Sequence, residues 1–125
     1  MPESSVVGDL VAAYLKAVAT GSGAEIAALY APDATVEDPV GGPMRRGTAA
    51  IQEMYAAIEN LGRETELLAL KVAGSSAAFH FRVRTELPDQ VVEVEPIDVM
   101  TFGEDGRITS MRAFWAPEDM RSIPR

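Results

Sequence analysis

The sequence predicts an α+β domain in which three helices come first and a sheet follows. In the first half, apolar residues recur at the three- and four-residue spacings of amphipathic helices. From residue 63 onward the apolar period changes to two, which is typical of strands. Several consecutive strands after a run of helices favour an antiparallel or mixed sheet over a doubly wound parallel one. With 125 residues, the range 1–125 is expected to form a single domain.

Three ranges in the first half carry the helical spacing. The first covers residues 5–20 and is stopped by the Gly-Ser-Gly sequence at 21–23. The second is a short helix over 24–30, and the third runs over 48–61 until Gly62. We therefore expect three helices before the main sheet begins.

The expected strands are short and follow the two-residue period. An extended piece over 35–39 comes between the second and third helices, and its Asp38 precedes a proline, which places that acid at a strand end. The later strands are expected over 77–84, 91–102 and 108–115, with a hairpin turn at 104–106. The polar range 117–125 is expected to be a loose C-terminal tail.

Composition excludes several classes of function. Eleven Lys and Arg against nineteen Asp and Glu give a net charge of −8, so we expect no nucleic-acid partner and no anionic-membrane partner. The chain has no Cys and one His, which excludes thiolate nucleophiles and a multi-histidine metal centre within one chain, and we expect no metal. The first residues lack the pattern of a signal peptide, so the expected location is cytoplasmic.

One acid interrupts an apolar pattern. In the range 91–102 the even positions are apolar except for Asp98. If the alternation continues through Pro96, the Asp98 carboxyl points toward the core or a pocket, where loss of water raises its pKa and keeps it neutral. Two other interpretations stay open here: a bulge at Pro96 could reverse the register, or Asp98 could simply bond a backbone amide.

The other candidates are weaker when each is taken alone. Asp38 could be an Asp-Pro turn residue, and Tyr14, Tyr30 and Tyr55 could be core residues on apolar helix faces. Taken together, two acids and several inward-facing phenols are typical of a proton-transfer site with an oxyanion hole. His80 shares a strand face with arginines, which favours a solvated position and no catalytic role.

Four segments carry a resemblance to a known family. They are the stretch DATVEDPVG at 33–41, GTAAI at 47–51, PID at 96–98 and SMRA at 110–113. In order and spacing, and together with Tyr14, they resemble the bacterial steroid delta-isomerases, also called ketosteroid isomerases, from about residue 6 to 116. The resemblance implies a cone of three helices against a strongly curved, mixed, largely antiparallel sheet, as in nuclear transport factor two, and a homodimer joined through the sheets.

The resemblance also implies roles for individual residues. Asp38 matches the family's general base, and Tyr14 and a protonated Asp98 match the two donors of its oxyanion hole, a pair of roles known for this family. Tyr30 and Tyr55 match a supporting chain of hydroxyls. The residues that match the family's apolar substrate pocket are Val18, Met54, Phe79, Phe81, Met100, Met111, Ala113 and Trp115, with Met54 in place of a Phe.

The implied activity is the transfer of a double bond within a delta-5-3-ketosteroid to the conjugated delta-4 position, without a cofactor. Two alternatives stay open. One is an enzyme of the same fold, of the epoxide hydrolase, dehydratase or polyketide cyclase type, that acts on another hydrophobic substrate. The other is a non-catalytic module that binds a hydrophobic ligand or serves dimerisation.

Overall fold

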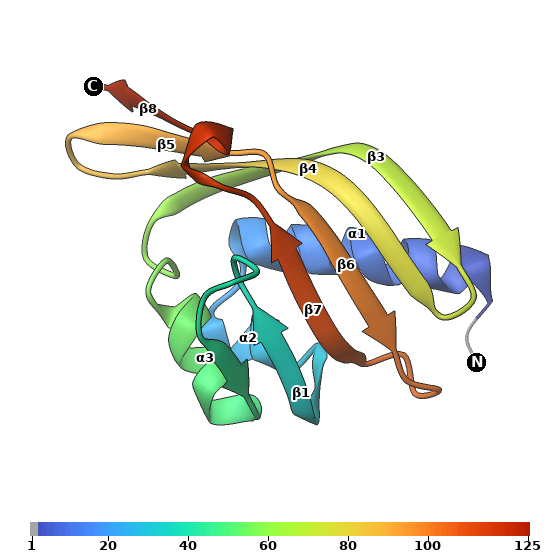
Figure 1. Cartoon of the computed structure of the whole chain (residues 1–125). Coiled ribbons are helices and arrows are strands. Elements are labelled where there is room, and N and C mark those ends of the chain that lie inside the picture. The colour runs from blue at the N-terminus through green and yellow to red at the C-terminus, as the bar shows by residue number, and fades with distance from the viewer. Residues whose placement is uncertain (1–2) are drawn as a thin grey trace.

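The computed structural model describes residues 3–125, and it contains the three predicted helices. These are α1 (Ser4–Thr20), α2 (Gly23–Ala27) and α3 (Thr48–Ala56), which lie on one side of the sheet (Figure 1). Helix α3 is shorter than expected, because the chain passes into turns after Ala56 and resumes as a strand at Gly62. None of the helices in the described range is long and apolar enough to span a membrane.

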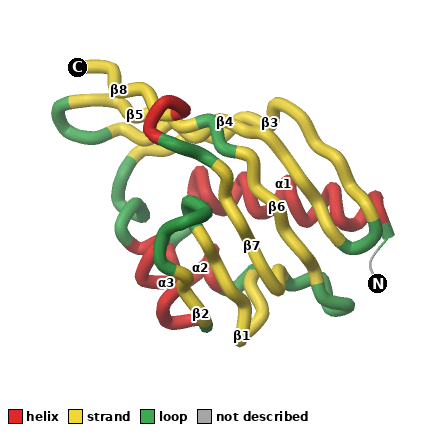
Figure 2. Tube along the Cα trace, in the orientation of Figure 1, coloured by secondary structure: helices red, strands yellow, loops and turns green. Residues whose placement is uncertain are grey.

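Eight strands form one curved sheet, which the tube view shows arching over the helices (Figure 2). Seven of them lie in the order β2-β1-β7-β6-β4-β5-β8, and β3 pairs with β4. Only the β1–β7 pair is parallel among the strand pairs of residues 3–125. The strands are β1 (Tyr30–Glu37), β2 (Met44–Arg46), β3 (Gly62–Ala73), β4 (Ser76–Glu86), β5 (Gln90–Val94), β6 (Ile97–Phe102), β7 (Ile108–Phe114) and β8 (Met120–Pro124). The predicted α+β class with a mixed, mostly antiparallel sheet is confirmed.

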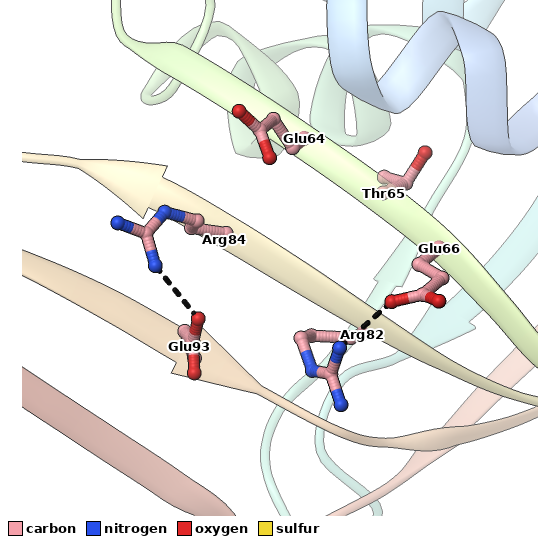
Figure 3. Close-up of a pocket in the computed structure, with 6 residues that line it drawn as sticks. All are labelled: Glu64, Thr65, Glu66, Arg82, Arg84 and Glu93. Atoms are coloured by element: carbon pink, nitrogen blue, oxygen red, sulfur yellow. Dashed lines mark hydrogen bonds and ion pairs between the residues drawn. The ribbon is translucent and has the colours of Figure 1, made fainter.

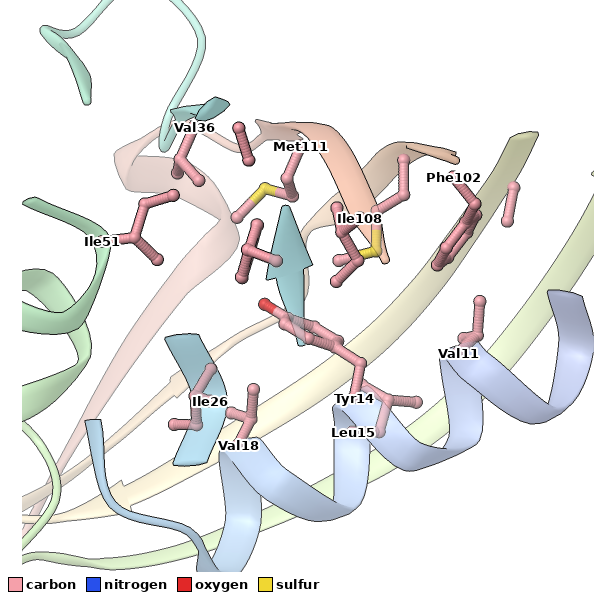
Figure 4. Close-up of a cluster of buried hydrophobic side chains, with 14 of the residues drawn as sticks. Val11, Tyr14, Leu15, Val18, Ile26, Val36, Ile51, Phe102, Ile108 and Met111 are labelled. Carbon is pink, nitrogen blue, oxygen red and sulfur yellow. The ribbon is translucent and has the colours of Figure 1, made fainter. Parts of the chain in front are cut away.

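The core lies between α1 and the concave face of the sheet. Tyr14 projects from α1 among apolar side chains of β1, β6 and β7, and most of these are almost fully buried (Figure 4). This follows from the sequence, because the helix presents one apolar stripe and the strands present every second residue. The buried residues of α1 are Val7, Val11, Tyr14, Leu15 and Val18.

Three expectations are wrong. The strand expected over 35–39 instead begins at Tyr30, which was expected in the second helix. The range 91–102 forms two strands, β5 and β6, separated at Glu95 and Pro96, because proline lacks the N–H that a continuous ladder needs. The predicted loose tail instead forms the short 3₁₀ helix η1 (Pro117–Asp119) and β8, which pairs antiparallel with β5. Backbone hydrogen bonds hold β8, so it needs no apolar pattern that the sequence would reveal.

Candidate active site

A cavity of about 200 Å³ lies between the helices and the concave face of the sheet. One part of its wall is polar and is formed by Tyr14, Asp38, Tyr55, Asp98 and Trp115. The remaining wall is apolar apart from one threonine and is formed by Val18, Ile58, Phe81, Val83, Thr85, Val94 and Pro96. The structure therefore brings both predicted acids and two of the three predicted tyrosines to one place.

Asp98 lies in the middle of the sheet, on β6, between Phe79 of β4 and Ala113 of β7. The residue is 1% exposed, and its Oδ1 atom is buried without a hydrogen-bond partner in the described chain. Burial raises the pKa of this carboxyl well above its ordinary value, and the nearby charge of Asp38 raises it further. A carboxyl held neutral in this way carries a proton that it can donate.

The geometry resolves the two open interpretations of Asp98. Val94, Pro96 and Asp98 all line the cavity, so the alternation of faces continues across the break between β5 and β6. A reversed register at Pro96 is therefore wrong. The bond to a backbone amide is also wrong, because the Asp98 side chain forms no hydrogen bond within residues 3–125.

Tyr14 is the cavity end of a chain of three hydroxyls. It shares a 2.9 Å hydrogen bond with the Tyr55 hydroxyl, which shares a 2.8 Å hydrogen bond with the Tyr30 hydroxyl. Tyr14 and Tyr55 line the cavity, whereas Tyr30 is buried behind them. Burial raises the pKa of all three phenols well above the ordinary value, so all three remain protonated donors.

Asp38 follows the last residue of β1, as predicted for a strand end. The parallel pairing of β1 with β7 brings it beside Trp115, whose indole Nε1–H donates to Asp38 Oδ1 at 2.7 Å. Burial raises the pKa of the Asp38 carboxyl, while the Trp115 hydrogen bond and the positive charge of Arg45 on β2 lower it again in part. Asp38 therefore ionises at a lower pH than Asp98.

The site thus joins an ionisable carboxylate to two protonated donors inside one mostly apolar cavity. Asp38 Oδ2 forms no hydrogen bond to residues 3–125, so this oxygen is free to accept a proton. Tyr14 and Asp98 are both buried donors on the same cavity wall. This combination can remove a proton from a C–H bond and stabilise the negative charge that then collects on a nearby oxygen.

Comparison with known proteins agrees with this arrangement. The profile of the SnoaL-like domain matches residues 11–111. The chain belongs to the SnoaL-like domain family. It is also 60% identical over 121 residues to a steroid delta-isomerase of Nocardioides simplex, with 97% of this chain and 98% of that protein covered. The family resemblance inferred from the sequence motifs is thereby confirmed.

A solved structure shares the SnoaL-like fold at lower identity. It is described as an epoxide hydrolase/cyclase-like enzyme, SalBIII, with a role in pyran ring formation in the polyether salinomycin. The TM-score is 0.86 at 29% sequence identity, and the alignment covers 96% of this chain and 98% of that one. The fold itself therefore accommodates more than one reaction.

The predicted substrate pocket of this SnoaL-like domain is only partly the observed cavity. Val18, Phe81 and Trp115 line the cavity. Met54 instead lines a separate surface hollow beside Arg45. Four further predicted pocket residues are packed in the core with at most 1% exposure: Phe79, Met100, Met111 and Ala113.

Sequence reasoning missed five residues of the cavity wall. Two of them, Val83 and Thr85, continue the two-residue alternation that starts at Phe79, so the pattern itself could have revealed them. The other three come from segments with less regular patterns, and they are Ile58, Val94 and Pro96.

Larger hollows lie on the opposite face of the sheet, because Arg82 and Arg84 alternate along β4 with the cavity-lining residues. Figure 3 shows the hollow that these two arginines line. Arg84 Nη1 donates to Glu93 at 2.9 Å, and Arg82 Nη1 donates to Glu66 at 2.7 Å. These ion pairs neutralise both arginines of the hollow, and its remaining acid, Glu64, is exposed to solvent and has no partner within residues 3–125. Within residues 3–125 no cluster of three metal-ligating side chains occurs.

Proposed function

We propose that this chain is a steroid delta-isomerase that converts a delta-5-3-ketosteroid to its conjugated delta-4 isomer. The observation that carries the proposal is the neutral, buried Asp98 beside protonated Tyr14 in the same cavity as the ionisable Asp38. The 60% identical steroid delta-isomerase supports the same activity and the steroid class of substrate.

In this mechanism the steroid carbonyl enters the closed end of the cavity and accepts hydrogen bonds from Tyr14 and Asp98. Asp38 removes a proton from carbon 4, and the electron pair of that C–H bond moves into the ring as the carbonyl becomes a dienolate. Asp38 then returns the proton to carbon 6, which shifts the double bond and restores the ketone. No atom is gained or lost, so one carboxylate serves both steps.

The two donors act mainly on the transition state. Their hydrogen bonds strengthen as oxygen 3 becomes anionic, and the apolar surroundings increase that gain because water does not compete. Positioned acid–base transfer contributes about 10²- to 10⁴-fold, and one donor to an oxyanion contributes about 10²- to 10³-fold. The carbonyl already acidifies the neighbouring C–H bond, so this chemistry needs no cofactor.

The test is an absorbance assay with a delta-5-3-ketosteroid. The purified protein should produce a growing ultraviolet enone absorbance with no cofactor added. Asp38→Asn should lose most of the turnover but still bind a phenolic steroid that mimics the dienolate, because the amide keeps the shape and loses the proton acceptor. No absorbance change at micromolar protein, or turnover retained by Asp38→Asn, would contradict the proposal.

A second candidate activity comes from the structural neighbour described as epoxide hydrolase/cyclase-like. It is the weaker one, because that neighbour is 29% identical whereas the steroid delta-isomerase is 60% identical. Ring opening of an epoxide by the same preparation, without isomerisation of the ketosteroid, would favour it.

We also propose a homodimer joined through the outer face of the sheet. Ile97 and Phe114 are paired on β6 and β7, and they are 46% and 42% exposed on the face opposite Asp98. Such neighbouring exposed apolar side chains are typical of an interface. Sedimentation should give a dimer that Phe114→Glu weakens, and a wild-type monomer would contradict this. The cytoplasmic location stays a prediction from the sequence.

A further inference from the structure

The cavity has a closed end and an open end. Asp98, Tyr14 and Phe81 are at most 4% exposed and form the closed end. Val83, Thr85 and Val94, farther along the same wall, are partly exposed. A rigid ligand whose carbonyl meets Tyr14 and Asp98 therefore extends its opposite end toward the Thr85 region.

Thr85 is chemically unlike its neighbours on this wall. Outside the five residues of the polar wall defined above, it is the only cavity-lining residue in the described chain with a polar side chain. Its hydroxyl forms no hydrogen bond with residues 3–125. Its strand neighbours on the cavity face, Val83 on β4 and Val94 on β5, are purely apolar.

The spacing along β4 suits the long axis of a steroid. Asp98 is paired with Phe79, and Thr85 lies six residues farther along β4 on the same face, which is about 20 Å along an extended strand. This separation is comparable with the length of four fused rings plus a hydrogen bond and a side chain at each end. A substituent on the ring farthest from the reacting carbonyl would therefore lie beside the Thr85 hydroxyl.

We propose that Thr85 is a specificity-determining residue that hydrogen-bonds an oxygen at the 17 position of the steroid. A threonine hydroxyl both donates and accepts, so a 17-ketone and a 17-hydroxyl are both suitable partners. This assignment rests on the proposed isomerase function and adds to it a polar contact at the end of the substrate farthest from the reacting carbonyl. The contact is remote from carbons 4 and 6, so it acts on substrate binding and leaves the chemical step alone.

The expected size follows from a neutral hydrogen bond at a partly exposed position. Such a bond is worth about a threefold to tenfold change in affinity. The wild-type KM for a 17-oxygenated delta-5-3-ketosteroid should therefore be about threefold to tenfold lower than for the matched 17-deoxy steroid, at similar kcat.

Two variants separate the hydroxyl from the shape of the side chain. Thr85→Val keeps the shape and removes the hydroxyl, whereas Thr85→Ser keeps the hydroxyl and removes a methyl group. The experiment measures KM and kcat for androst-5-ene-3,17-dione and androst-5-en-3-one with each protein. It also measures equilibrium binding of two phenolic steroids that differ only in the 17-oxygen. Circular dichroism establishes that each variant is folded.

We expect Thr85→Val to lose the lower KM for the 17-oxygenated substrate, and we expect Thr85→Ser to retain it. An unchanged preference in Thr85→Val, or no preference in the wild type, would overturn the role of Thr85. Failure of the proposed function is distinguishable, because it would abolish turnover of both substrates. Equilibrium binding of the two phenolic steroids would still show whether the 17-oxygen changes the affinity.

Discussion

Replacing Tyr14 by Phe tests the proposed oxyanion hole most directly, because Tyr30→Phe is a matched control. Both changes remove one hydroxyl and keep the ring, and each removes one hydrogen bond to the Tyr55 hydroxyl, of 2.9 Å and 2.8 Å respectively. Tyr55 retains one partner in either case. The two variants differ in that Tyr14 lines the cavity and Tyr30 does not.

The structure predicts a similar loss of folding stability in the two variants but a different loss of activity. Each variant loses one neutral hydrogen bond without leaving Tyr55 unpaired, so each should be less stable by about 1 kcal/mol. For a chain of this size that is a fall in Tm of about 3–5 °C. Tyr14→Phe also removes a donor to the developing oxyanion, so its kcat should fall about 10²- to 10³-fold.

The assay combines thermal unfolding with the enone absorbance rate for both variants. Tyr30→Phe should lower kcat by less than about tenfold, because it acts only through the hydrogen-bond chain. Equal losses of kcat in the two variants would refute the reasoning, since Tyr14 would then have no contact with the substrate that Tyr30 lacks.

Three further predictions concern the acids. Asp98→Asn, which still donates a hydrogen bond, should lose less kcat than Asp98→Ala, for which about a 10²- to 10³-fold loss is expected; equal losses would argue against a neutral donor. Arg45→Gln should raise the pKa of Asp38 and move the acid limb of the kcat/KM profile to higher pH, whereas Arg46→Gln should move it less. Because the raised pKa of Asp98 makes the folded state bind more protons, folding stability falls as pH rises above the unfolded value of about 3.9. The gain in urea stability from Asp98→Asn should therefore increase between pH 4 and pH 7, and a constant gain would contradict a neutral Asp98.

The sequence was most informative where side chains alone decide the structure. The period change near residue 63 predicted the helix-to-sheet order, and the single acid in an apolar alternation identified Asp98 as buried. Both follow from burial, which depends on local pattern. The roles proposed for Asp38 and Tyr14 required the family resemblance, because an Asp-Pro strand end and a tyrosine on a helix face have ordinary structural explanations.

Other features depend on contacts that local pattern does not encode. Strand β8 is held by backbone pairing with β5 and has mostly exposed side chains, so its composition looked like a tail. Whether an apolar residue lines a cavity or fills the core depends on distances across the whole sheet. Met100 and Met111 have the same apolar pattern as Phe81, yet they are fully packed while Phe81 faces the cavity.

The unpaired Oδ1 of Asp98 connects the fold to the proposed function. A buried polar atom without a partner destabilises a fold by about 1–3 kcal/mol, so a core selected for stability alone would pair it or replace it. The three tyrosines nearby form hydrogen bonds with one another. The groups of the site that can still form a hydrogen bond with a ligand are therefore the two acids and Tyr14. An anionic oxygen in the cavity would supply the hydrogen-bond partner that Asp98 lacks within the protein. Its hydrogen bond to Asp98 would be stronger than that of a neutral ketone. In the proposed function, the same local instability would therefore make the cavity complementary to a dienolate in preference to the ketone it forms from.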